Sequence, residues 1–260
     1  MKLFVASLLS GLFFSTTLFA NPSRPVCSMQ LLCDQMRNTN TVLNFDIPEN
    51  TNSEKSLESL EPLFAENQAA ILELLAQRKS SLSQSTFDSL VKAISTVTLG
   101  NFEDPKIRKV FPGACNRPNA IYIAGMHKVY VCPSLLSYPQ GTLKQILAHE
   151  LGHVIQKLQN HIPCFKDFPK KQVDEIFADW VASKVLSEKI ALERDKRAAG
   201  KQAFESQLLF LSLACGQPQK KPDWAQTHPN FQNRIEQIFL SQPAFQEALR
   251  CHSKSMNSCG

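Results

Sequence analysis

Two histidines four residues apart, His149 and His153, enclose a glutamate within an apolar stretch, and this spacing constrains the fold more than any other feature of the chain. Apolar residues recur here on one broad stripe, which predicts a helix over residues 141–158. Side chains four apart share one helix face, so both imidazoles reach the same point. Burying them and the Glu150 carboxylate without partners would be costly. We therefore expect a site on this helix.

The run His149-Glu150-Leu151-Gly152-His153 has the form H-E-x-x-H, which is associated with zinc. Both imidazoles would bind one Zn2+ ion, and Glu150 would act as the general base toward a water on that ion. Gly152 leaves room beneath the site for a neighbouring element. The pattern also arises by chance, and a surface helix with polar residues at helical spacing is the competing interpretation. The apolar circumference of this helix argues against it.

A catalytic zinc ion usually has a third protein ligand and an open fourth position. The metzincin arrangement would place a glycine six residues and a histidine ten residues after His149. Ile155 and Gln159 occupy those positions, so that arrangement is excluded. His161 follows the end of the predicted helix, and we expect it to be a loop residue.

A second predicted helix over residues 173–193 offers the missing ligand. Glu175 would complete the metal triad, and Asp179, one turn later on the same face, would accept the second N–H of a ligand histidine. Asp174 is the alternative carboxylate, but no acid follows it one turn later. An ordinary exposed acidic face is the competing interpretation of Glu175 and Asp179.

The first twenty residues have the pattern of a secretory signal peptide. Lys2 precedes an uncharged apolar run that ends at Ala20. An uncleaved anchor is the alternative, because the run is nearly long enough to cross a bilayer. No later stretch is comparably long and apolar. We therefore expect an exported protein, periplasmic or secreted, without a stable membrane span after signal cleavage.

An even number of cysteines in an exported chain indicates disulfides formed in an oxidising compartment. Pairing of neighbours, Cys27 with Cys33 and Cys251 with Cys259, is the simplest expectation. No C-x-x-C pair occurs, so we dismiss a cysteine zinc cluster. The eight cysteines are Cys27, Cys33, Cys115, Cys132, Cys164, Cys215, Cys251 and Cys259.

The net charge of +5 is scattered along the chain, and we expect no nucleic-acid partner. Residues 21–110 are predicted to form an N-terminal helical region without chemistry of its own. Apolar residues at helical spacing predict helices over 53–77 and 86–97, and Pro62 should kink or restart the first of these. Residues 111–260 would then form the domain that carries the predicted zinc site.

Two β-prone runs, 120–123 and 129–132, are separated by Gly125 and its neighbours, which predicts a β-hairpin. Two further helices are expected over 204–214 and 231–240. Pro229 suits the start of the last helix, with Thr227 or His228 at its cap. The fold class is therefore α+β and mainly helical.

Three short motifs in a fixed order resemble the HtpX-like peptidase family, which includes the CAAX prenyl proteases and soluble periplasmic members. The likeness covers residues 119–235 and is to the soluble, exported branch. Its motifs are Asn119-Ala120 with a hairpin ending in Ser134-Leu135-Leu136 and then Ala148-His149-Glu150-Leu151-Gly152-His153-Val154; Glu175-x-x-Ala178-Asp179-x-x-Ala182; and Thr227-His228-Pro229 with Arg234-Ile235.

The resemblance implies a zincin fold of the gluzincin type, one Zn2+ per chain and endopeptidase activity. His149, His153 and Glu175 would be the metal ligands and Glu150 the base. In such folds a strand at the cleft edge holds extended substrate by main-chain pairing, and either strand of the hairpin is a candidate.

The third motif adds two expectations. His228 would donate to the developing oxyanion, and Arg234 would orient Glu175 or Asp179. A helix cap and a surface arginine are the competing interpretation. Possible oxyanion donors also include three tyrosines, each of which we expect to be a packing residue: Tyr122, Tyr130 and Tyr138.

The function predicted from these patterns is zinc-dependent cleavage of peptide bonds in exported or misfolded proteins, with a protein or peptide as the partner. Two alternatives remain open. One is a metal-binding chaperone or binding module with little catalysis, against which Glu150 argues, because binding alone does not need that residue. The other is a zinc amidase that acts on cell-wall peptide. The sequence predicts no oligomeric state.

Overall fold

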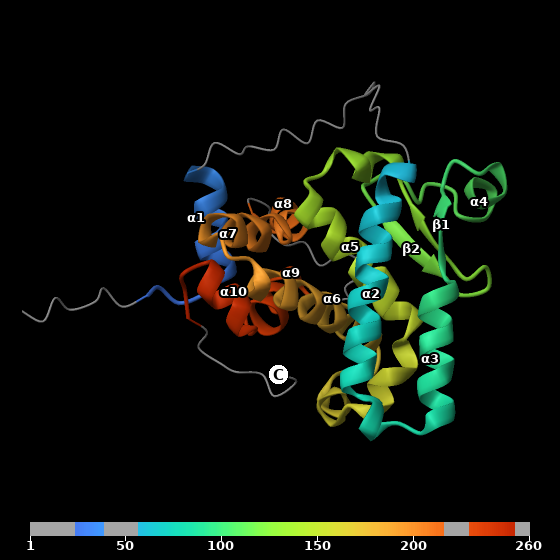
Figure 1. Cartoon of the computed structure of the whole chain (residues 1–260). Coiled ribbons are helices and arrows are strands. Elements are labelled where there is room, and N and C mark those ends of the chain that lie inside the picture. Colours follow the sequence, from blue (N-terminus) through green and yellow to red (C-terminus); the bar gives the residue numbers. More distant parts are fainter. Residues whose placement is uncertain (1–23, 39–56, 216–228, 253–260) are drawn as a thin grey trace, which may run out of the picture.

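The computed structural model describes residues 24–38, 57–215 and 229–252 (Figure 1). The predicted signal peptide, His228 and Cys259 lie outside the described residues. Within them, no helix is long and apolar enough to span a membrane.

The described chain is mainly helical with one small sheet. The α-helices are α1 (Met29–Asn38), α2 (Glu61–Gln77), α3 (Gln84–Thr96), α4 (Pro105–Val110), α5 (Gln140–Val154), α6 (Val173–Leu192), α7 (Lys196–Glu205), α8 (Leu208–Ala214), α9 (Phe231–Asn233) and α10 (Pro243–Ala248). The strands are β1 (Thr98–Asn101), β2 (Ala120–Ile123) and β3 (Lys128–Val131). The short 3-10 helices are η1 (Leu57–Leu60), η2 (Lys79–Ser81), η3 (Pro133–Ser137), η4 (Gln156–His161) and η5 (Pro163–Asp167), and η7 (Arg234–Phe239) is a π-helix.

The predicted hairpin is confirmed, because β2 and β3 pair antiparallel. The sequence interpretation missed the third strand. β1 pairs parallel with β3, which gives the order β1–β3–β2 and leaves β2 at an edge. A disulfide between Cys115 and Cys132 joins the loop before β2 to the residue after β3. Helix α5 packs against β2, so the edge strand lies next to the H-E-x-x-H helix.

Among the described elements, helices α5 and α6 make the most extensive contact. Gly152 makes it close: a Cβ at this position would lie 2.8 Å from the Cα of Ala178 in α6. The expectation that Gly152 leaves room for a neighbouring element is therefore confirmed. Helix α2 packs on both α5 and α6 (Figure 1). One apolar core contains residues of all three helices.

The predicted helices differ from the observed ones mainly at their ends. Helix α5 ends at Val154 and the 3-10 helix η4 begins at Gln156, so α5 is shorter than the predicted helix over residues 141–158. The apolar run 204–214 is divided between α7 and α8 at Ser206, which is buried and donates to the carbonyl of Ala203. Pro62 lies in the first turn of α2, where its missing N–H costs nothing, so it starts that helix rather than kinking it.

The last predicted helix begins at Phe231, as expected, but its cap is different. Asn230 is the N-cap and its side chain accepts from the backbone N–H of Asn233. The proposed cap at Thr227 or His228 is therefore wrong. After one turn the backbone continues as the π-helix η7, which begins at Arg234.

The expected pairing of neighbouring cysteines is also wrong. Cys27 bonds to Cys251, and Cys33 bonds to Cys215. The reason is that the two ends of the described chain lie together: the N–H of Cys27 donates to the carbonyl of His252 at 2.7 Å. None of the described cysteines is free.

Candidate metal centre

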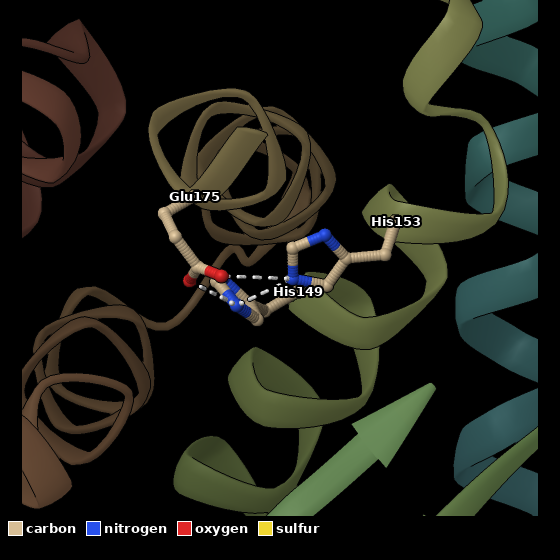
Figure 2. A group of neighbouring side chains, drawn as sticks. All are labelled: His149, His153 and Glu175. Atoms are coloured by element: carbon tan, nitrogen blue, oxygen red, sulfur yellow. Dashed lines mark hydrogen bonds and ion pairs between the residues drawn. The ribbon is translucent and has the colours of Figure 1, made fainter. Parts of the chain in front are cut away.

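Three potential ligand atoms from α5 and α6 converge on one point (Figure 2). The Nε2 atoms of His149 and His153 are 3.2 Å apart. The Glu175 carboxylate oxygens lie 3.4 Å from His149 Nε2 and 3.7 Å from His153 Nε2. Within the described residues, this is the group of histidine, cysteine and acidic side chains that can hold a metal ion.

These separations suit a tetrahedral metal ion. Nitrogen and oxygen ligands lie about 2.0–2.2 Å from zinc, so two ligands of a tetrahedral site are about 3.3–3.6 Å apart. The three observed distances bracket that range, and all three side chains are mostly buried. The residues therefore fit a tetrahedral metal ion such as zinc, with one position left open.

The helices place these side chains by simple geometry. His149 and His153 are one turn apart on α5. Glu175 is in the first turn of α6, where the helix dipole favours a carboxylate. The contact between Gly152 and Ala178 lets α6 approach until Glu175 reaches the imidazoles. The triad therefore depends on the distance between α5 and α6.

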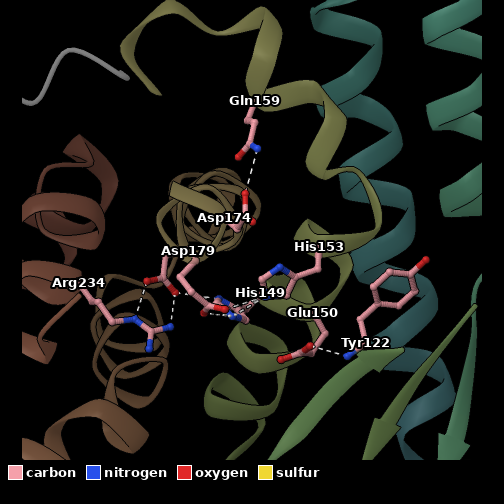
Figure 3. A network of polar contacts seen from close by, with 9 residues as sticks. Tyr122, His149, Glu150, His153, Gln159, Asp174, Asp179 and Arg234 are labelled. Atoms are coloured by element: carbon pink, nitrogen blue, oxygen red, sulfur yellow. Dashed lines mark hydrogen bonds and ion pairs between the residues drawn. The ribbon is translucent and has the colours of Figure 1, made fainter. Parts of the chain in front are cut away.

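A buried ion pair lies behind the triad (Figure 3). Asp179 is fully buried and accepts from Nδ1–H of His149 at 2.8 Å. Arg234 donates two hydrogen bonds to the same carboxylate, at 2.6 and 2.7 Å. Its guanidinium carbon also lies 4.3 Å from the centre of the Phe210 ring. Arg234 thus pairs with Asp179 rather than with Glu175. Because Asp179 accepts from Nδ1–H of His149, Nε2 of His149 is the nitrogen that faces His153 and Glu175.

The charges around this pair set its ionisation. Burial alone raises the pKa of Asp179, but the Arg234 charge and the His149 hydrogen bond outweigh burial and hold that pKa below its usual value. For His149, burial lowers the pKa, and the hydrogen bonds to Asp179 and Glu175 reverse this and raise it to about 10. With this pKa the imidazole of His149 carries a positive charge at pH 7.

His153 has the opposite tendency. Burial, together with the neighbouring His149 cation, lowers the pKa of His153 to about 4. This imidazole is therefore neutral at pH 7 and has a lone pair for a metal ion.

Glu150 lies beside the triad and is not a member of it (Figure 3). Its Oε2 accepts from the backbone N–H of Tyr122, on the edge strand β2, at 2.7 Å. Burial raises the pKa of Glu150 to about 7, although the His149 cation and the Tyr122 hydrogen bond lower it in part. A carboxylate with this pKa exchanges protons readily near neutral pH.

Several residues that the sequence analysis considered are not members of the triad. Asp174 accepts from Gln159 at 3.0 Å instead of facing the ligands. His161 ends η4 and is not in the triad. Tyr130 and Tyr138 are buried packing residues, and burial raises the pKa of Tyr138 to about 12.

The hydrogen bond from Tyr122 to Glu150 was not predicted. It comes from a backbone N–H, and such a donor has no signature in residue type. Two features of the sequence could have indicated this hydrogen bond: the predicted hairpin before the H-E-x-x-H helix, and the expected burial of Glu150, which requires a partner.

No family model, curated protein or solved structure matches this chain in the comparisons with known proteins.

Proposed function

We propose that this chain is a zinc-dependent peptidase. The observation that carries the proposal is the pairing of a His149–His153–Glu175 donor triad with an adjacent carboxylate, Glu150, that is not itself a ligand. A purely structural zinc site uses four protein ligands and needs no neighbouring base. Three donors with a base beside them are what hydrolysis at a metal requires.

The role of each group in the proposed reaction follows from its contacts. A bound zinc ion supplies a Lewis acid that acidifies water and polarises a substrate carbonyl. Glu150 accepts the proton from the attacking water and passes it to the leaving amine, and its pKa of about 7 suits both transfers. The Tyr122 N–H holds the Glu150 carboxylate in place, and Asp179 keeps His149 oriented.

The edge strand offers a way to bind an extended peptide. Among the described strands, β2 pairs with β3 on one side only, and the N–H of Tyr122 points from its other side toward Glu150. Backbone groups on this side can pair with substrate main chain, which would be recognised irrespective of its sequence. Together with the disulfides, this supports a protease that acts on unfolded segments of exported proteins.

Cleavage of casein by Glu150→Gln tests the proposal. The variant should retain zinc, because the ligands are intact, and should lose at least about a hundredfold in turnover, because the base is gone. Glu193→Gln, which changes an exposed carboxylate just after α6, is the matched control and should cleave like the wild type. Normal cleavage by Glu150→Gln at full zinc content would refute the mechanism. Zinc binding without cleavage by the wild type would instead favour a binding module.

A further inference from the structure

A cavity of about 440 Å³ opens next to the candidate metal centre. It lies between α3, the β2–β3 turn, the C-terminal end of α5 and η4. His153, a candidate ligand, lines it on one side, and Tyr122, whose N–H contacts Glu150, lines it on another. A peptide held at the triad would therefore place a neighbouring side chain at the mouth of this cavity.

The wall of the cavity opposite the triad comes from α3. Ser89 and Ala93 are one turn apart on this helix and both line the cavity, with Leu90 between them. Small side chains at Ser89 and Ala93 leave the space open. Helix α3 lies in the predicted N-terminal helical region, so that region is not separate from the candidate site.

A chain of hydrogen bonds joins this wall to the hairpin. Thr96 of α3 donates its hydroxyl proton to the carbonyl of Lys92, so it must accept from Nε2–H of His127. Nδ1 of His127 then accepts from the Tyr122 hydroxyl at 3.0 Å. His127 has a positive φ of 51°, a conformation that costs energy for a residue with a side chain. These hydrogen bonds fix the position of α3 relative to the β2–β3 hairpin, and the cavity lies between these two elements.

The charge of the lining is one-sided. Lys157 lines the cavity, and among the residues that the structure describes no aspartate or glutamate does. Ser89, Gln156 and Asn160 add hydrogen-bond donors, whereas Leu90, Ala93 and Val154 supply apolar surface. A lysine or arginine side chain finds no partner of opposite charge in such a cavity. A carboxylate or carboxamide on a long apolar stem meets both kinds of surface.

We propose that this cavity is a specificity pocket for a glutamate or glutamine side chain beside the scissile bond, with α3 as its wall and Lys157 as its charge selector. The inference rests on the proposed peptidase function and names the class of substrate. It makes Ala93 and Lys157 specificity-determining residues of that reaction.

Cleavage of a degenerate peptide library, read by mass spectrometry, tests the pocket. The wild type should cut next to glutamate or glutamine about three- to fivefold more often than next to lysine, the preference expected from one solvated charge. Lys157→Glu should reverse the preference between glutamate and lysine. Lys166→Glu, an exposed lysine outside the lining, is the matched control and should leave the profile unchanged.

Size is tested separately on α3. Ala93→Phe should fill the cavity and lower cleavage next to every long side chain, while cleavage next to alanine persists. Ser95→Phe, exposed on the same helix and outside the lining, controls for the helix itself. Cleavage with no preference at the flanking position, or a preference that neither Lys157→Glu nor Ala93→Phe alters, overturns the pocket and leaves the peptidase proposal standing.

If the wild type cuts no peptide, the peptidase proposal fails, and binding still decides the pocket. Fluorescence anisotropy would compare two labelled alanine pentapeptides, one with a central glutamate and one with a central lysine. Tighter binding of the glutamate peptide, reversed in Lys157→Glu, supports the pocket. Equal binding of the two peptides overturns it.

Discussion

Gly152 is the position at which one added methyl group should disturb the metal centre without touching a ligand. A Cβ there would lie 2.8 Å from the Cα and 3.2 Å from the carbonyl oxygen of Ala178. Both are backbone atoms, so no side-chain rotation relieves the contact. Ordinary van der Waals contact begins at 3.4 Å, and α6 must therefore retreat by about 0.6 Å or more in Gly152→Ala.

The shift acts on zinc affinity more than on stability. Alanine gains about 1 kcal/mol over glycine in a helix, which offsets part of the roughly 1–3 kcal/mol that overpacking costs. The free energy of unfolding should thus fall by at most about 2 kcal/mol. Glu175 lies one turn before Ala178 and moves with it, and a site tolerates displacements of only about 0.5 Å. We expect zinc affinity to fall at least about tenfold.

The assay is a zinc titration in competition with a chromophoric chelator. Gly125→Ala is the control, because a Cβ at Gly125 meets nothing within 4 Å. That variant should bind zinc like the wild type. Unchanged zinc affinity in a folded Gly152→Ala would refute the claim that the spacing of α5 and α6 sets the triad.

Three further outcomes follow from the contacts. Arg234→Met removes the guanidinium from the buried Asp179 carboxylate and leaves it the His149 imidazole as a partner, so thermal unfolding should show a loss of about 3 kcal/mol, the lower end of the cost of breaking a buried pair, whereas exposed Arg197→Met should show little. His149, with its pKa raised to about 10, must release a proton to bind metal, so zinc affinity should rise with pH between about 7 and 10. Calorimetry of zinc binding at pH 8 in two buffers should detect the release of about one proton, and binding without proton release would contradict this. Non-reducing peptide mapping should recover Cys27 linked to Cys251, and recovery of the local pairs instead would contradict the fold.

The parts of the fold that the sequence predicted are those with a local pattern. Helices α5 and α6 follow an apolar stripe, and the hairpin follows two β-prone runs around a turn. β1 was missed because it has four residues, includes Gly100 and is stabilised by parallel pairing with β3. Such pairing depends on tertiary contact, which a local pattern does not contain.

Disulfide pairing shows the same limit. Cys27 and Cys33 are neighbours in sequence, yet each bonds to a residue near the other end of the chain. Their partners are decided by how the two ends of the fold meet. The spacing of cysteines along the chain does not indicate which segments of the fold come into contact.

The candidate site was predictable where side chains act at helical spacing. His149, His153, Glu175 and Asp179 were identified from two helices, and the structure brings all four together. Asp179 was one of the two partners expected for Arg234, and the choice between them depends on the fold.

The zinc content of the purified chain tests the central claim most directly. Elemental analysis of the wild type should give about one zinc per chain, because two imidazoles and one carboxylate converge with tetrahedral spacing. The variant Glu175→Ala should hold much less. A wild-type chain that contains no zinc and takes up none on reconstitution would contradict the account.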